Sequence, residues 1–69
     1  MKMYVVQHLK DGKWFKYKMF DRFDEAQFCA CTLAERYPSE QFWVFDRLTK
    51  KYVFTCVFVD GEPVEVVAW

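Results

Sequence analysis

The sequence feature that most constrains the fold is a single helical segment at residues 21–37, with strand-like sequence on both sides of it. Side chains spaced three and four residues apart fall on one face of an α-helix. The core-facing stripe of this helix is therefore expected to be Phe23, Ala26, Gln27, Ala30, Leu33, Ala34 and Tyr37. Asp21 is a suitable N-cap, and Pro38 ends the helix because the residue before a proline is pushed out of helical geometry.

The rest of the chain predicts five strands. Residues 3–9 and 14–20 are rich in β-forming side chains. They are joined by Asp11-Gly12, which favours a tight hairpin because both residues tolerate positive φ. Residues 41–45, 52–59 and 64–69 have the same character, with turns at 46–51 and 60–63 in which Asp46 can bond the backbone. The sequence therefore predicts one domain over residues 1–69, an α+β fold of order ββαβββ with a single helix on one face of an antiparallel sheet.

Regular alternation along the first hairpin assigns its side chains to two faces. Counting outward from the Asp11-Gly12 turn pairs His8 with Phe15 and Tyr4 with Met19. The face expected to join the core holds Tyr4, Val6, His8, Phe15, Tyr17 and Met19. The opposite face, which meets water or a partner, holds Met3, Val5, Gln7, Leu9, Trp14, Lys16, Lys18 and Phe20.

Both faces of the C-terminal strands are apolar, whereas a sheet with one wet face should alternate apolar and polar residues. One face is predicted to carry Phe42, Val44, Val53, Thr55, Val57, Val59, Val64, Val66 and Ala68. The other is predicted to carry Trp43, Phe45, Tyr52, Phe54, Cys56, Phe58, Val67 and Trp69. A helix of about 16 residues is roughly 24 Å long and covers one face only.

Two interpretations of the uncovered face remain open. The sheet can curl into a small barrel that buries both faces, or the second face can pack against a partner. Aromatic residues make up 22% of the chain, and aromatic side chains are enriched at interfaces, which favours the partner. The expected partner contacts are Trp43, Phe45, Tyr52, Phe54 and Trp69 on the sheet, with Phe28 on the outward side of the helix.

The formal net charge is zero, but the signs are segregated along the chain. Residues 1–20 hold five lysines and one acidic residue, while residues 21–40 hold five acidic and two basic residues. A net charge of zero favours association, since it provides little mutual repulsion.

The basic hairpin supplies an alternative function. Lys13, Trp14, Lys16 and Lys18 interleave cations with aromatic rings, a pattern that can follow a phosphate backbone while rings stack on bases. The residues Asp11-Gly12-Lys13-Trp14, a following Phe and Asp24-Glu25-Ala26 resemble the sheet-then-helix DNA-binding modules of tyrosine recombinases. That resemblance implies nucleic-acid binding through the 10–18 hairpin.

The candidate chemical groups predict neither catalysis nor metal binding. Cys29 and Cys31, about 200° apart around a helix, cannot share one tetrahedral ion. Cys56 is expected to be a buried small hydrophobe, although a Cys56–His8 dyad stays open. Two glycines, both in turns, do not make a phosphate-binding loop. We therefore expect no enzyme activity, cofactor, metal or small-molecule substrate.

Three cysteines cannot form a closed disulfide set, which predicts reduced thiols in a cytoplasmic protein. No signal peptide or membrane span is evident, so a complete small gene product is expected. A short, aromatic-rich chain of this kind resembles, in size and composition, the accessory proteins of bacteriophages and mobile elements, including anti-CRISPR inhibitors. The resemblance implies a small non-enzymatic protein-binding module or inhibitor, acting as a homodimer or on a host protein through its uncovered aromatic sheet face.

Overall fold

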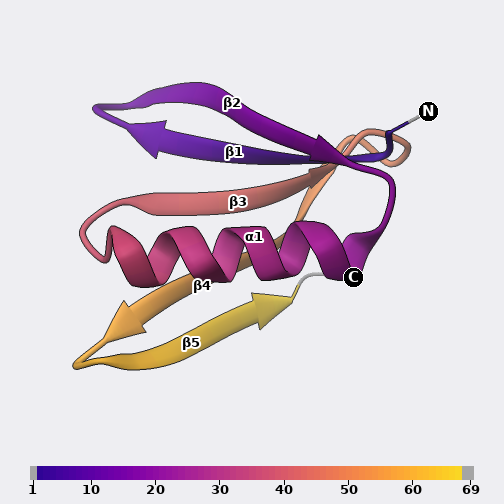
Figure 1. Cartoon of the computed structure of the whole chain (residues 1–69). Coiled ribbons are helices and arrows are strands. Elements are labelled where there is room, and N and C mark those ends of the chain that lie inside the picture. The colour runs from indigo at the N-terminus through magenta and orange to yellow at the C-terminus, as the bar shows by residue number, and fades with distance from the viewer. Residues whose placement is uncertain (1, 68–69) are drawn as a thin grey trace.

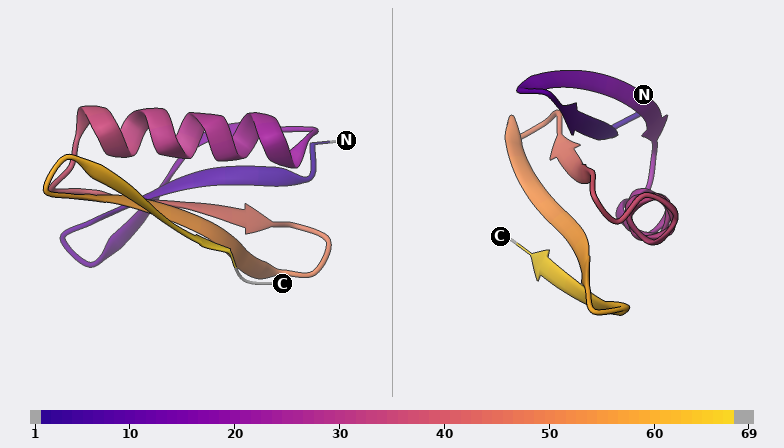
Figure 2. Two further views of the ribbon diagram at one scale, coloured as in Figure 1. Left: turned by 90° about the horizontal axis from the view of Figure 1, so that it is seen from below. Right: turned by 90° about the vertical axis from the view of Figure 1, so that its left-hand side faces the viewer.

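The computed structural model describes residues 2–67, which form one antiparallel sheet crossed on one face by one helix (Figures 1 and 2). The elements in chain order are β1 (Tyr4–Lys10), β2 (Lys13–Phe20), α1 (Phe23–Arg36), β3 (Gln41–Asp46), β4 (Lys51–Val59) and β5 (Glu62–Val67). The predicted α+β order ββαβββ is confirmed. Trp69, one of the predicted partner contacts, lies outside the described residues, as does Ala68.

The strand order across the sheet is β2-β1-β3-β4-β5. The N-terminal hairpin joins the C-terminal strands through the antiparallel pairing of β1 with β3. Within residues 2–67 the sheet is open, with β2 and β5 at its two edges, so these residues do not form the closed barrel. No helix in this part of the chain combines the length and the apolar run needed to cross a membrane.

Turn chemistry explains the two hairpins. Asp11-Gly12 and Asp60-Gly61 each have positive φ at both residues, the conformation required by the two-residue turn that matches strand twist. In the longer β3–β4 connection, the Asp46 carboxylate accepts a hydrogen bond from the Leu48 amide at 2.9 Å, as predicted.

A β-bulge in each half of the sheet breaks the regular alternation that the sequence suggested. The pairing of β1 with β2 shifts between Val6 and Gln7 of β1, so that Val6 pairs with Lys18 and Gln7 pairs with Lys16. Tyr17 is the extra residue that this bulge adds to one strand. The pairings near the turn, including His8 with Phe15, are as predicted, but Tyr4 pairs with Phe20 rather than Met19. The predicted face assignments of Lys18, Met19 and Phe20 are therefore wrong.

The second bulge, between Val44 and Phe45, makes Val53 the extra residue in β4. Val44 then pairs with Phe54, and both lie under the helix. Phe54 is only 1% exposed, so its assignment to the uncovered face is wrong. The physical reason is the same as in β2. One inserted residue reverses the alternation, so every side chain beyond the bulge faces the opposite side of the sheet from the one that regular alternation predicts.

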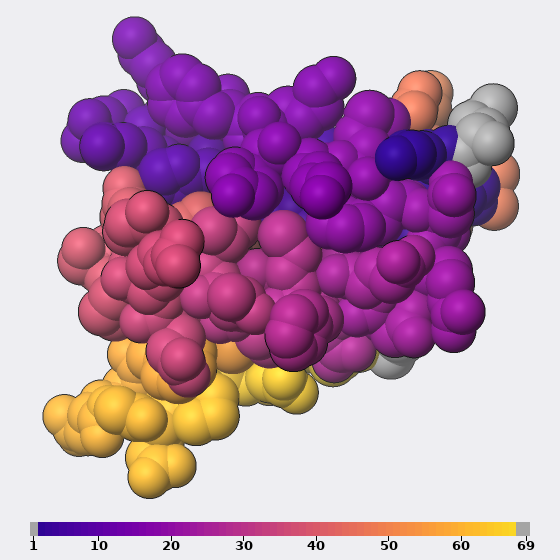
Figure 3. Space-filling view, viewed as in Figure 1, coloured from indigo at the N-terminus to yellow at the C-terminus, as the bar shows by residue number. Residues whose placement is uncertain are grey.

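The core lies between α1 and the face of the sheet that the helix covers. Small side chains on the helix let it approach closely, and the sheet supplies the bulk, as the helix stripe predicted. The buried residues of the cluster are Val6, Ala26, Ala30, Leu33, Ala34, Phe42, Val44, Val53, Phe54 and Cys56. Figure 3 shows that the helix covers the middle of this face and that the β4–β5 hairpin projects beyond it.

Two details of the helix differ from expectation. The N-cap is Arg22, which makes no capping side-chain bond, rather than Asp21. Arg22 has extended backbone geometry and forms an ion pair with Asp24 at 3.1 Å, so the chain enters the helix one residue later than predicted. Tyr37 follows the last helical residue and is exposed rather than part of the core.

Candidate functional site

The sheet face opposite α1, which we call the open face, carries most of the sheet residues predicted to contact a partner. The strand register assigns to it Val5, Gln7, Leu9, Trp14, Lys16, Met19, Gln41, Trp43, Phe45, Tyr52, Thr55, Val57, Val59, Glu62, Val64 and Val66. Of the predicted contacts, Trp43, Phe45 and Tyr52 are brought together here.

Tyr52 is the centre of an aromatic cluster on the open face, formed with Trp14, Trp43 and Phe45. Its ring stacks on Trp14 with centroids 4.8 Å apart and meets Phe45 and Trp43 edge-on at 5.0 and 6.0 Å. Two strands, β1 and β3, separate Trp14 on β2 from Tyr52 on β4. Contact across that span requires the strong twist of the sheet visible in Figure 2.

Polar contacts hold this cluster in place. The Tyr52 hydroxyl donates a hydrogen bond to Gln7 Oε1 at 2.6 Å, and burial raises the pKa of the Tyr52 phenol above its ordinary value. Trp43 Nε1 donates to Gln41 Oε1 at 3.1 Å. Val5, which pairs with Phe45 in the sheet, is almost fully buried. Part of the open face is thus a second, smaller core that the sheet builds by itself.

The remainder of the open face stays uncovered. Trp14 is 44% exposed at one side of the cluster, and on the other side lies a valine strip formed by Val59, Val64 and Val66, of which Val66 is 50% exposed. Every residue of β5 is exposed. The exposed side chains of Trp14 and of the valine strip offer apolar contact area and carry no reactive group.

The basic residues of the hairpin do not share a face. Lys13 and Lys16 are three residues apart, so they fall on opposite faces of β2 by ordinary alternation, and the bulge at Tyr17 moves Lys18 from the face of Lys16 to the helix side. The Lys18 ammonium lies 5.4 Å from the centre of the Phe20 ring. Trp14, the aromatic member of the predicted basic strip, already has one ring face stacked on Tyr52.

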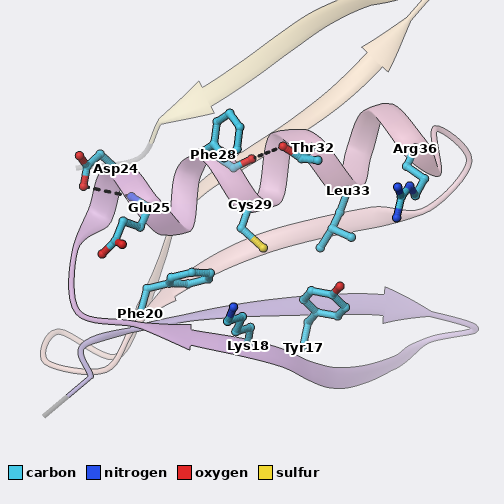
Figure 4. A pocket seen from close by; sticks show the side chains of 10 residues that line it. All are labelled: Tyr17, Lys18, Phe20, Asp24, Glu25, Phe28, Cys29, Thr32, Leu33 and Arg36. Atoms are coloured by element: carbon cyan, nitrogen blue, oxygen red, sulfur yellow. Dashed lines mark hydrogen bonds between the residues drawn. The ribbon is translucent and has the colours of Figure 1, made fainter.

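Phe28 lies apart from the open face, on α1, where it is 74% exposed as predicted. It borders a groove of about 600 Å³ between α1 and β2. The groove residues are Tyr17, Lys18, Phe20, Asp24, Glu25, Phe28, Cys29, Thr32, Leu33 and Arg36. In Figure 4, Cys29 and Leu33 point toward β2 and Phe28 points away from it. Charges of both signs line the groove, with Asp24 and Glu25 acidic and Lys18 and Arg36 basic.

His8 makes contacts that stabilise the fold. Its Nε2 lies 3.0 Å from Glu40 Oε1, and its ring stacks on Phe42 with centroids 4.7 Å apart. Phe42 pairs with His8 on one side and with Cys56 on the other. The two side chains are therefore two strand spacings apart, about 9.5 Å. The Cys56–His8 dyad is not formed.

The structure instead brings Cys56 of β4 close to Cys31 of α1 and Glu65 of β5. One ligand atom from each lies within 4.8 Å of the other two. The Cys31 thiol donates a hydrogen bond to Glu65 Oε1 at 3.3 Å, and burial together with this acceptor and Cys56 raises the pKa of Cys31. Cys29 points elsewhere, toward the groove, as the helical spacing predicted.

This thiol–carboxylate cluster was not predicted, because helical spacing relates Cys31 to Cys29 and not to residues on the strands. One signal was available. Counting outward from the two-residue turn Asp60-Gly61 pairs Cys56 with Glu65. The approach of Cys31 had no local signal, since it depends on how α1 lies across the sheet.

Comparison with known proteins finds no significant match to a family model, a curated protein or a solved structure.

Proposed function

We propose that the protein is a small non-enzymatic protein-binding module that associates through its open face, in the first place with a second copy of itself. The observation that carries the proposal is the exposed apolar surface that one helix leaves uncovered, from Trp14 to the valine strip. Contiguous apolar surface with aromatic residues is typical of protein interfaces.

Charge complementarity supports a second copy as the occupant. On the open face the β2 edge carries Lys16 and the β5 edge carries Glu62, whereas Lys13, Lys18 and Glu65 lie on the helix side. When two sheets face each other across a two-fold axis parallel to their strands, β2 of one copy lies opposite β5 of the other. The edge that carries Lys16 in one copy then lies on the edge that carries Glu62 in the other, so each side of the interface combines one lysine with one glutamate. An axis perpendicular to the strands would place β2 on β2, which like charges disfavour.

Association through the sheet edges is less well supported than association through the face. The β2 edge combines three lysines with a bulge at Tyr17, and the β5 edge contains Pro63. Lysine, proline and bulges are the features by which natural sheets prevent edge pairing.

A dimer of this kind would leave the helix side free for a further partner. That side presents Phe28 and the α1–β2 groove. The resemblance in size and composition to phage accessory proteins suggests a host or defence protein as this partner, with inhibition as the outcome and the cytoplasm as the place of action. The three cysteines are free thiols, which fits a reducing compartment.

Light scattering at micromolar concentration tests self-association. We expect a mass near twice the 8.4 kDa of the chain. Val66→Lys, which adds a charge to the open face, should give a monomer. Val67→Lys is the matched control, because Val67 is similarly exposed but lies on the helix side of the same strand. A monomeric wild-type protein, or equal loss of the dimer in both variants, would contradict the proposal.

A further inference from the structure

Side chains from three different elements meet beside the acidic edge of the sheet. Cys31 comes from α1, Cys56 from β4 and Glu65 from β5, and their ligand atoms all lie within 4.8 Å of one another. Cysteine sulfur and carboxylate oxygen are both ligands of zinc, and thiolates select zinc over magnesium or calcium. The geometry points to a Zn²⁺ site formed by Cys31, Cys56 and Glu65, with water in the fourth position.

The spacing fits tetrahedral coordination. Zinc–sulfur bonds of about 2.3 Å and zinc–oxygen bonds of about 2.1 Å imply ligand-to-ligand separations of about 3.5–3.8 Å. Cys31 Sγ and Glu65 Oε1 are already 3.3 Å apart. The remaining separations are at most 4.8 Å, so small side-chain rotations complete the geometry.

The burial of the three ligands suits a site open to solvent on one side. Cys56 is fully buried, which fixes its sulfur in the core, and Cys31 is half-buried. Glu65 lies on the exposed edge strand and leaves a coordination position open to water. Bound zinc would tie β5, whose residues are all exposed, to the helix and to β4.

Cobalt titration of the reduced full-length protein tests the site. Co²⁺ is the probe because tetrahedral cobalt–thiolate sites show a charge-transfer band in the near ultraviolet and intense visible bands. A non-thiol reductant keeps Cys31 and Cys56 from forming a disulfide. We expect these bands to saturate at one Co²⁺ per chain and to disappear when Zn²⁺ is added.

Three variants connect the signal to the proposed ligands. Cys31→Ser should abolish the charge-transfer band. Glu65→Gln should weaken Co²⁺ binding by more than roughly tenfold, since even groups that only orient a metal ligand have effects of that size. Cys29→Ser is the matched control, two residues away on the same helix with its side chain toward the groove, and should titrate like the wild type.

A second measurement is the melting temperature. A ligand that binds only the folded state stabilises that state. Zn²⁺ should therefore raise the melting temperature of the wild type and of Cys29→Ser but not that of Cys31→Ser. If Cys31→Ser does not fold, Glu65→Gln decides the question, since residue 65 is exposed. Absence of the charge-transfer band in the wild type, its survival in Cys31→Ser, or its loss in Cys29→Ser would each overturn the zinc site.

Discussion

Removing the Tyr52 side chain tests whether the open face contains a second core. The ring of Tyr52 contacts Trp14, Trp43 and Phe45. Aromatic pairs contribute about 0.5–1.5 kcal/mol each beyond the area they bury. Tyr52 makes three such pairs, and its ring is only partly buried. We therefore expect Tyr52→Ala to lower the free energy of unfolding by about 3 kcal/mol, which is at the lower end of the range for truncation of buried aromatic residues to alanine.

The hydroxyl can be separated from the ring. Tyr52→Phe keeps the three ring contacts and removes only the hydrogen bond to Gln7, so it should destabilise by about 1 kcal/mol. In a domain of this length about 1 kcal/mol shifts the melting temperature by roughly 4–8 °C. The expected decreases are therefore roughly 12–24 °C for Tyr52→Ala and roughly 4–8 °C for Tyr52→Phe.

Thermal unfolding followed by circular dichroism measures both shifts, at one protein concentration and with the oligomeric state of each variant checked by light scattering. Tyr17→Ala is the control, because Tyr17 is 57% exposed at the bulge in β2, and it should change stability by no more than about 0.5 kcal/mol. If Tyr52→Ala melts within a few degrees of Tyr17→Ala, the aromatic cluster is not a second core and the reasoning is refuted.

Two further predictions concern pH and the main core. The pKa of Tyr52 is raised in the folded protein, so its stabilising contribution is complete below the ordinary tyrosine pKa of about 10 and declines as pH rises toward the folded-state value. Alkaline denaturation curves should show this decline in the wild type, and the same decline in Tyr52→Phe would contradict it. Phe54→Ala, at a fully buried position, should lower the unfolding free energy by about 3–5 kcal/mol. A shift below about 1 kcal/mol in denaturant titration would show that Phe54 is not a core residue.

The sequence by itself determined the elements and their order, because the signals for these features are local. Helical spacing identified the Ala26, Ala30 and Leu33 stripe, and the Asp11-Gly12 turn defined the first hairpin through its positive φ angles. The pairings next to that turn were predictable for the same reason, since turn length sets the register of the residues that flank it. Of the predicted sheet contacts, Trp43, Phe45 and Tyr52 share a face as expected.

The tertiary structure alone decided which residues face which way beyond the bulges. A bulge inserts one residue without a local signal, and the bulges at Tyr17 and Val53 moved Lys18 to the helix side and Phe54 into the core. The pairing of β1 with β3 joins segments more than 30 residues apart, and it set the strand order. The approach of Cys31 to Glu65 likewise depends on how the helix packs on the sheet, since no periodicity within one element relates residues on two.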